Sequence, residues 1–196
     1  MTQRPYHHGN LRTALIQQAE RTVRERGADQ LSLRALARDV GVSHAAPRRH
    51  FPDRQALLDA LAEAGFARLG EELRHAIDAA GPAFEPQLHA AAAAYVRFAT
   101  DDAALLELMF AVKHQQESGH LQEAAERAFA VLLELIERGQ AAGVLEAGDP
   151  ERVGLLLFAT LQGVAAFVAG GLVDAEQRDE LVADAVTHFL RGSAPS

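Results

Sequence analysis

Apolar residues recur along this chain at the spacing of an α-helix rather than that of a β-strand. Residues three and four positions apart share one face of a helix, so this spacing gives each segment a face that can be buried. No stretch shows sustained alternation of apolar and polar residues between turn signals, and β-branched residues are sparse. The sequence therefore predicts an all-α fold.

The residues that interrupt this pattern place the helix boundaries. Asp53 and Asp149 stand where helices begin, because a short acidic side chain can accept a hydrogen bond from an unpaired backbone N–H group. Pro150 follows at a first-turn position, where a missing N–H costs little. We predict nine helices: two short ones within residues 31–51, and others at residues 9–26, 53–80, 84–99, 102–114, 118–142, 150–170 and 174–191.

Residues 31–51 read LSLRALARDVGVSHAAPRRHF, which describes two short helical stretches on either side of Gly41. Glycine adopts the left-handed conformation that ends many helices without a Cβ clash. Ser32 and Ser43 each precede a helical stretch, where a hydroxyl can cap the backbone. A short helix that is cationic at its end and braced by a second helix is what the DNA major groove accepts. The cationic group consists of His44, Arg48, Arg49 and His50.

The distribution of charge supports this interpretation, although the net charge of −8 alone argues against nucleic acid. Residues 1–54 hold ten arginines and five acids, a net charge of +5, whereas residues 55–196 hold nine basic residues and 22 acids, a net charge of −13. A run of like charge is often only a solvated surface. Because the positive end coincides with the helix-turn-helix, it is typical of a phosphate-binding surface.

Residues 31–61, LSLRALARDVGVSHAAPRRHFPDRQALLDAL, resemble the DNA-binding domain of the TetR (tetracycline repressor)/AcrR-like family of bacterial transcription regulators. The aromatic Phe51 and the turn at residues 52–54 match the family pattern, and residues 4–27 resemble its first helix with the N-terminal arm. The chain departs from the pattern at Arg48, where the family usually has tyrosine, and at the preceding Pro47, where it usually has an apolar residue.

This resemblance implies a nine-helix architecture, with a helix-turn-helix DNA-binding domain at residues 1–52 and an effector-binding and dimerisation domain at residues 53–196. It implies a ligand-responsive regulator, a repressor in most members, that binds a palindromic operator as a homodimer. The roles carried over from the family are phosphate contacts by Ser32, Ser43, Arg48, His50 and Arg54, and base contacts by Arg34, His44, Ala45 and Arg49. Arg4 is a further candidate for a minor-groove contact, with a merely solvated side chain near the start of the chain as the alternative.

Bulky side chains concentrate in the later helices, where the resemblance implies a cavity for a small apolar or amphipathic effector. Aromatic residues at helical spacing are equally typical of a plain core. Polar groups that could orient a ligand are Tyr95, His114, Thr160 and Gln162, since such sites combine an apolar lining with few polar groups. The expected pocket consists of Phe66, Leu69, Leu73, Tyr95, Phe98, Met109, Phe110, Phe129, Phe158 and Gln162.

Residues 153–173 are apolar enough to raise the alternative of a membrane span. Their four glycines, polar interior and acidic flanks instead favour a helix buried on nearly every side. A stripe of small residues lets another helix approach closely, and we expect the last two helices of each subunit to form a four-helix dimer interface, with packing within one chain as the alternative. The stripe consists of Ala159, Gly163, Ala166 and Gly170.

The sequence lacks the residues and motifs that several classes of function require. The chain has no cysteine, hence no disulfide or thiolate site, and the adjacent His7 and His8 are badly spaced for a metal. No phosphate-binding glycine loop, nucleophile elbow or HExxH motif occurs, and the pair Asp101-Asp102 is interpreted as acids at a helix start, so we expect no enzyme, cofactor or metal. The start of the chain lacks an apolar stretch, which favours the cytoplasm. An architectural DNA-binding protein without sequence preference remains the alternative.

Overall fold

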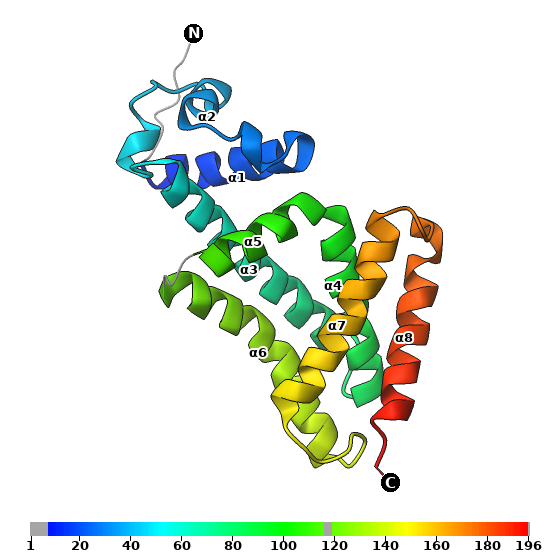
Figure 1. Cartoon of the computed structure of the whole chain (residues 1–196). Coiled ribbons are helices and arrows are strands. Elements are labelled where there is room, and N and C mark those ends of the chain that lie inside the picture. The colour runs from blue at the N-terminus through cyan, green and yellow to red at the C-terminus, as the bar shows by residue number, and fades with distance from the viewer. Residues whose placement is uncertain (1–7, 116–118, 196) are drawn as a thin grey trace. The chain divides into compact units, whose positions relative to one another are not determined.

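A computed structural model describes residues 8–115 and 119–195, and within these residues the chain contains helices and no β-strand. Three 3₁₀ turns, η1 (Ala28–Gln30), η2 (Pro47–Arg49) and η3 (Ala175–Gln177), lie between α-helices. The all-α fold predicted from the apolar spacing is confirmed. The eight described α-helices (Figure 1) are α1 (His8–Arg26), α2 (Leu33–Val40), α3 (Arg54–Ala79), α4 (Phe84–Asp101), α5 (Ala103–Gln115), α6 (Gly119–Ala141), α7 (Pro150–Ala169) and α8 (Arg178–Gly192).

The second helix of the predicted helix-turn-helix is the 3₁₀ turn η2, which accounts for eight α-helices where the sequence predicted nine. Pro47 has no N–H to donate to the carbonyl of Ser43, so the α-helical hydrogen bonding is interrupted there. The backbone continues with i to i+3 bonds, from Arg49 N to Ala46 O at 3.3 Å and from His50 N to Pro47 O at 2.9 Å. Ala46 occupies the N-cap of this turn, so the capping role predicted for Ser43 is wrong.

The other predicted helix signals behave as expected. Gly41 ends α2 in the left-handed conformation, with φ 78° and ψ 32°. Ser32 Oγ accepts a hydrogen bond from Ala35 N at 3.1 Å at the start of α2. Asp53 Oδ1 accepts a hydrogen bond of 2.8 Å from the backbone N–H three residues later in the chain. Asp149 Oδ1 accepts one of 3.0 Å from the backbone N–H two residues later. These local side-chain bonds fix where α2, α3 and α7 begin.

The described chain divides into two compact units, each with its own core. The first unit comprises the residues up to Phe66 together with residues 104–122, and the second comprises residues 67–103 and 123–196. The division falls inside α3, so this helix contributes residues to both cores. Each unit is held by buried apolar side chains, which supply the main driving force for folding.

The first unit packs α1 against α2 and η1, and α2 against η2. One face of α1 is buried at the four-residue spacing expected of an amphipathic helix. Phe51, directly after η2, keeps only 1 % of its surface exposed. Burial of an aromatic ring at this position ties η2 to the core of the unit. The buried side chains of this core include Leu11, Leu15, Ala19, Val23, Leu36, Ala37, Leu57 and Leu61.

The second unit is centred on α4, which packs against α7 and α8. Alanines on α4 allow this close packing, and Tyr95 and Val96 in its middle are completely buried. α3 contributes Leu69 and Leu73 to the same core. Further buried side chains are Leu88, Phe98, Leu135, Ile136, Leu157, Leu161, Val182 and Val186.

Candidate functional site

The predicted DNA-contacting side chains of α2 and the turn that follows it are largely open to solvent. Arg34, Arg48 and Arg49 are exposed, and none of them forms an ion pair with another residue in the described ranges. His44 and Ala45 are exposed beside them. Guanidinium groups that are not neutralised by the protein can bind phosphates or the acceptor edge of guanine. This group of exposed side chains, with Ser43, forms the cationic turn.

Apolar and aromatic contacts on its buried side fix the cationic turn in place. Pro47 and Phe51 are buried, and the guanidinium carbon of Arg12 lies 5.5 Å from the centre of the Phe51 ring. His50 is half-buried, and its ring centre lies 6.5 Å from that of Phe51. The proline that breaks the helix is therefore also part of the packing that fixes the turn.

Two residues predicted to contact phosphate also have structural roles. Ser32 accepts the capping bond at the start of α2, although its O–H can still donate to a phosphate oxygen. Arg54 donates from Nη2 to the carbonyl of Ala28 at 2.8 Å and from Nε to that of Leu31 at 3.2 Å. These two bonds fasten the start of α3 to the chain that enters α2. The predicted minor-groove residue Arg4 lies outside the described residues.

Replacing Arg54 by alanine is expected to lower the free energy of unfolding by about 1 kcal/mol, because two backbone carbonyls lose their partner. Arg34→Ala is the matched control, since it removes the same charge from an exposed side chain without such bonds. Urea denaturation followed by circular dichroism measures both. Equal stability of the two variants would show that the Arg54 bonds do not support the fold.

The residues of the expected effector pocket are distributed over both units. Phe66, Met109 and Phe110 belong to the first unit, where the rings of Phe66 and Phe110 meet edge to face with centres 5.9 Å apart. The others belong to the second unit, in which Leu69 and Leu73 are buried. Within the second unit, α4, α6 and α7 bring three aromatic residues together as one cluster.

This aromatic cluster consists of Tyr95, Phe129 and Phe158. The ring centres of Tyr95 and Phe158 lie 5.4 Å apart, and those of Phe129 and Phe158 lie 5.3 Å apart in an edge-to-face contact. Gln162 stands one helical turn after Phe158 on α7 and is half-buried. Thr160, in contrast, is exposed and donates to the carbonyl of Leu156, so it does not join the cluster. The side chain of His114 lies outside the described residues.

Within this cluster, Tyr95 carries a polar group, its hydroxyl, that is buried. The residue is 0 % exposed, and its oxygen has no hydrogen-bond partner among the residues that the structure describes. Burial away from water raises the pKa of this phenol above its ordinary value of 10.0. Tyr95 is therefore a neutral, buried hydroxyl that can both donate and accept a hydrogen bond.

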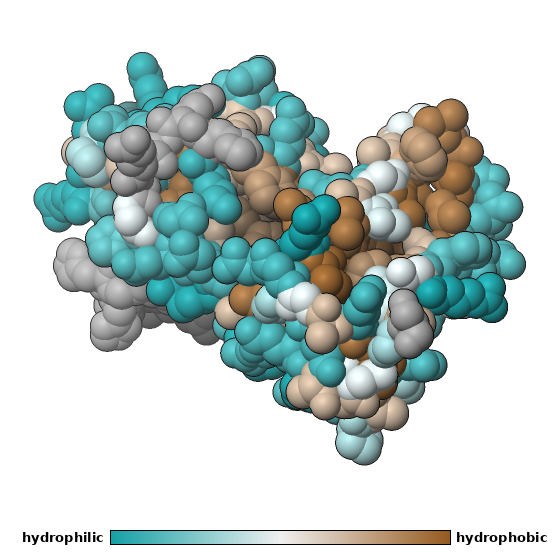
Figure 2. Space-filling view, turned by 60° about the horizontal axis from the view of Figure 1, so that its bottom comes forward, coloured by the Kyte–Doolittle hydropathy of each residue, from teal (hydrophilic) through white to brown (hydrophobic). Residues whose placement is uncertain are grey.

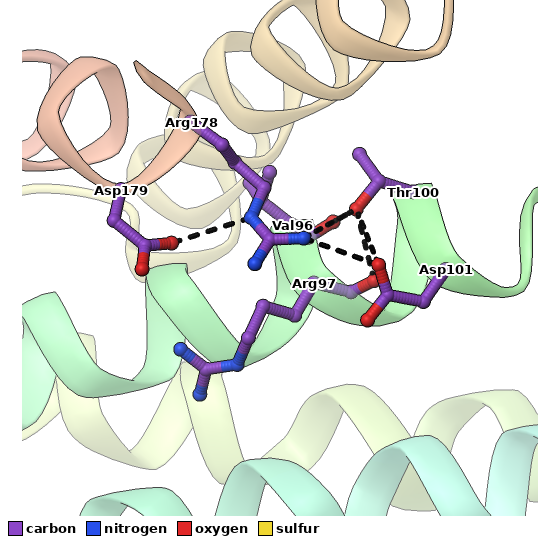
Figure 3. A network of polar contacts seen from close by, with 6 residues as sticks. All are labelled: Val96, Arg97, Thr100, Asp101, Arg178 and Asp179. Atoms are coloured by element: carbon purple, nitrogen blue, oxygen red, sulfur yellow. Dashed lines mark hydrogen bonds and ion pairs between the residues drawn. The ribbon is translucent and has the colours of Figure 1, made fainter. Parts of the chain in front are cut away.

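A polar network at the end of α4 was missed by the sequence reasoning. Arg178 donates from Nη1 to Thr100 Oγ1 and to Asp101 Oδ1, both at 3.1 Å, and from Nε to Asp179 Oδ1 at 3.3 Å (Figure 3). Asp102 accepts from Arg68 Nη2 at 2.6 Å.

The two adjacent aspartates were interpreted as acids at a helix start, which is correct for Asp102 and wrong for Asp101. Asp101 is the last residue of α4, where the helix dipole disfavours an acid, whereas Asp102, the C-cap of α4, also stands directly before α5, where the dipole favours one. Arg178 compensates for this at Asp101, and Arg68 is the partner of Asp102. No periodicity could have revealed the pairs, because Arg178 lies 77 residues beyond Asp101.

One face of α7 is apolar and exposed. Leu155, Leu156 and Phe167 on α7 and Leu172 after it retain 65, 60, 52 and 76 % of their surface. Exposed apolar surface is visible in Figure 2, in which hydrophobic residues are brown. The prediction that this helix is buried on nearly every side is therefore wrong for the single chain.

The stripe of small residues lies on the same exposed face. Ala159, Ala166 and Gly170 are exposed, and outside the adjoining backbone of α7 itself no atom lies within 4 Å of the position that a Cβ of Gly163 would take. Packing within one chain at Gly163, the alternative considered above, is thus not observed.

By length and composition α7 could also cross a membrane, which for a single helix is weak evidence. Among the described residues, no three His, Cys, Asp or Glu side chains group closely enough to hold a metal.

The helical fold and the exposed cationic turn are typical of a DNA-binding protein of the helix-turn-helix class. The family model "Bacterial regulatory proteins, tetR family" matches residues 15–61, and "Tetracyclin repressor-like, C-terminal domain" matches residues 88–189. The chain belongs to the TetR family of bacterial transcription regulators. It is therefore a regulator with DNA-binding and ligand-binding domains and not an enzyme.

Solved structures have the same fold. A protein of unknown function from Rhodococcus sp. RHA1 is 45 % identical, with a TM-score of 0.91 over 98 % of this chain and 100 % of that one. A TetR-family regulator from Pectobacterium atrosepticum is 23 % identical (TM-score 0.74, 96 % of each chain). The regulator PfmR from Thermus thermophilus is 17 % identical (TM-score 0.70, 90 % of this chain and 97 % of that one). The last two likenesses establish the fold alone. No curated protein matches the chain.

Proposed function

We propose that this protein is a ligand-responsive repressor that binds a palindromic operator as a homodimer. The observation that carries the proposal is the cationic turn, in which Arg34, Arg48 and Arg49 are exposed without a counter-ion among the described residues. Phosphate contacts supply affinity, whereas contacts to base edges supply sequence preference. We assign the base-reading role to Arg34, His44, Ala45 and Arg49, and the phosphate-binding role to Ser32, Ser43, Arg48, His50 and Arg54, with Arg4 in the minor groove.

Dimerisation through α7 and α8 is part of this proposal. The exposed face of α7 combines large apolar side chains with a stripe of small ones, and a symmetric partner would cover both. Two subunits would present two DNA-reading heads, residues 1–52, to half-sites about 34–36 Å apart, which is one turn of DNA. The remainder, residues 53–196, would then hold the dimer interface and the effector. Such a regulator acts in the cytoplasm, where it reaches the chromosome.

The effector is expected to be a small apolar or amphipathic molecule that binds in the body of the protein and releases the operator. The aromatic cluster of the second unit supports this role. Coupling between effector and operator typically amounts to about 1–3 kcal/mol and is reciprocal, so operator DNA should weaken effector binding by the same factor.

A comparison of promoter and scrambled DNA tests the proposal. The purified protein is expected to bind a duplex from its own promoter about 10³-fold or more tightly than a scrambled duplex of equal length and composition. Fluorescence anisotropy at several salt concentrations measures both affinities. Equal affinities would instead identify an architectural protein without sequence preference.

A further inference from the structure

The buried hydroxyl of Tyr95 calls for a partner that the described chain does not supply. The side chain is 0 % exposed, and its oxygen makes no hydrogen bond with any residue in the described ranges. A buried polar group without a partner is unfavourable, and native proteins rarely retain one without a role. Phenylalanine would fill the same space without this cost. A molecule that accepts a hydrogen bond from the hydroxyl would remove this cost.

The surroundings of the hydroxyl fit an apolar molecule. Phe158, which contacts the Tyr95 ring, is only half-buried, as is Phe129, which contacts Phe158. These rings thus keep accessible surface next to a completely buried tyrosine. Aromatic rings attract planar apolar groups through stacked and edge-to-face contacts. The rings offer area, while the hydroxyl offers one directional bond.

The half-buried arginines of the same unit are already paired. Arg68 is engaged by Asp102 at 2.6 Å, and its guanidinium carbon lies 4.7 Å from the centre of the Phe98 ring. Arg178 is engaged by Asp101 and Asp179 (Figure 3). The side chains of these two arginines are 30 and 17 % exposed, and both are neutralised by carboxylates. An ionised ligand would lose its hydration beside Tyr95 without gaining a counter-ion from them.

We propose that the effector is a neutral, mainly apolar molecule with an acceptor oxygen such as a carbonyl, and that Tyr95 is its polar anchor. This inference rests on the proposed function, because it names the class of effector for the same regulator. The Tyr95 hydroxyl donates to the acceptor oxygen, and Phe129 and Phe158 contact the apolar part.

Three matched probes test the chemistry of the site. Acetophenone carries a ring and a neutral carbonyl, ethylbenzene carries the ring without an acceptor, and benzoate carries the ring with a charge. The chain has two tyrosines and no tryptophan, so Tyr6→Phe leaves Tyr95 as its sole tyrosine. In this background, ¹³C labelling at tyrosine Cζ gives one NMR signal, which reports directly on the hydroxyl of Tyr95.

Acetophenone is expected to bind saturably, to shift the Tyr95 signal, and to bind the Tyr95→Phe variant about two- to tenfold more weakly by calorimetry. Ethylbenzene should bind both proteins alike, and benzoate should bind the wild type at least tenfold more weakly than acetophenone does. Absence of a saturable shift, equal acetophenone affinity for both proteins, or benzoate binding as tight as that of acetophenone would overturn the inference.

The unfolding temperature of the Tyr95→Phe variant shows whether the hydroxyl lacks a partner in the protein without ligand. Without ligand, Tyr95→Phe is expected to unfold at a higher temperature than the wild type, because the unpartnered hydroxyl is gone. A lower unfolding temperature would mean that the hydroxyl already has a partner within the protein, which contradicts the inference. The promoter comparison separates the two proposals: if promoter preference persists while Tyr95→Phe leaves acetophenone binding unchanged, only the effector inference fails. If promoter preference is absent, the proposed function fails.

Discussion

Replacing Gly163 by leucine is expected to convert the dimer into monomers and to weaken operator binding at least about 100-fold. The monomer has room for the new side chain, since outside the adjoining backbone of α7 itself no atom lies within 4 Å of the Cβ position. In a symmetric dimer, however, the leucine would enter the close approach of two helices from both subunits at once, and overpacking of this kind is destabilising. The loss of operator affinity follows because two linked heads gain about 10²–10⁴ over one.

Sedimentation velocity at several protein concentrations measures the dimer, and fluorescence anisotropy measures the operator affinity. Gly154→Leu is the matched control, because Gly154 also has open space at its Cβ position but lies on the opposite face of α7. That variant should remain dimeric. A Gly163→Leu dimer as stable as the wild type would place the interface elsewhere.

Replacing Arg49 by alanine is expected to reduce the preference for promoter over scrambled DNA about 5- to 150-fold. An arginine that binds guanine through two hydrogen bonds contributes about 1–3 kcal/mol of discrimination between bases. Arg49 is exposed at the end of η2, which places its guanidinium on the cationic turn. The affinity of the Arg49→Ala variant for scrambled DNA should fall much less than its affinity for the promoter.

Arg48→Ala provides the matched comparison, since the neighbouring arginine is equally exposed and is assigned to phosphate. This variant should bind all sequences more weakly by a similar factor and lower the slope of log affinity against log salt by about one. Arg54→Ala is less suitable, because it also removes bonds to two backbone carbonyls. Loss of preference in Arg48→Ala but not in Arg49→Ala would reverse the two assignments.

Much of the fold was predictable because its signals are local. Asp53 and Asp149 bond to N–H groups within three residues, so their position in the sequence fixes where α3 and α7 begin. The turn at Pro47 was predicted as α-helix because apolar and cationic spacing does not distinguish α from 3₁₀ geometry. The missing N–H of proline decided between them.

The features that were not predictable depend on distant partners. Asp101 pairs with Arg178, and Asp102 pairs with Arg68, although nothing in the sequence links these positions. The exposed face of α7 could not be foreseen either, because apolar composition shows that a helix can be buried but not whether its own chain buries it. Likewise, the sequence shows that Tyr95 is aromatic but not that its hydroxyl lacks a partner among the described residues.

The pair Arg68–Asp102 constrains how regulators with altered operator preference can be constructed from this protein. Arg68 lies in the part of α3 that packs with the second unit, and its carboxylate partner is the C-cap of α4. A chimera that takes its DNA-reading segment from a homologue should therefore join the two sequences within α3 before Arg68. A junction placed after Arg68 would put a foreign residue opposite Asp102 and leave this carboxylate, only 11 % exposed, without its counter-ion.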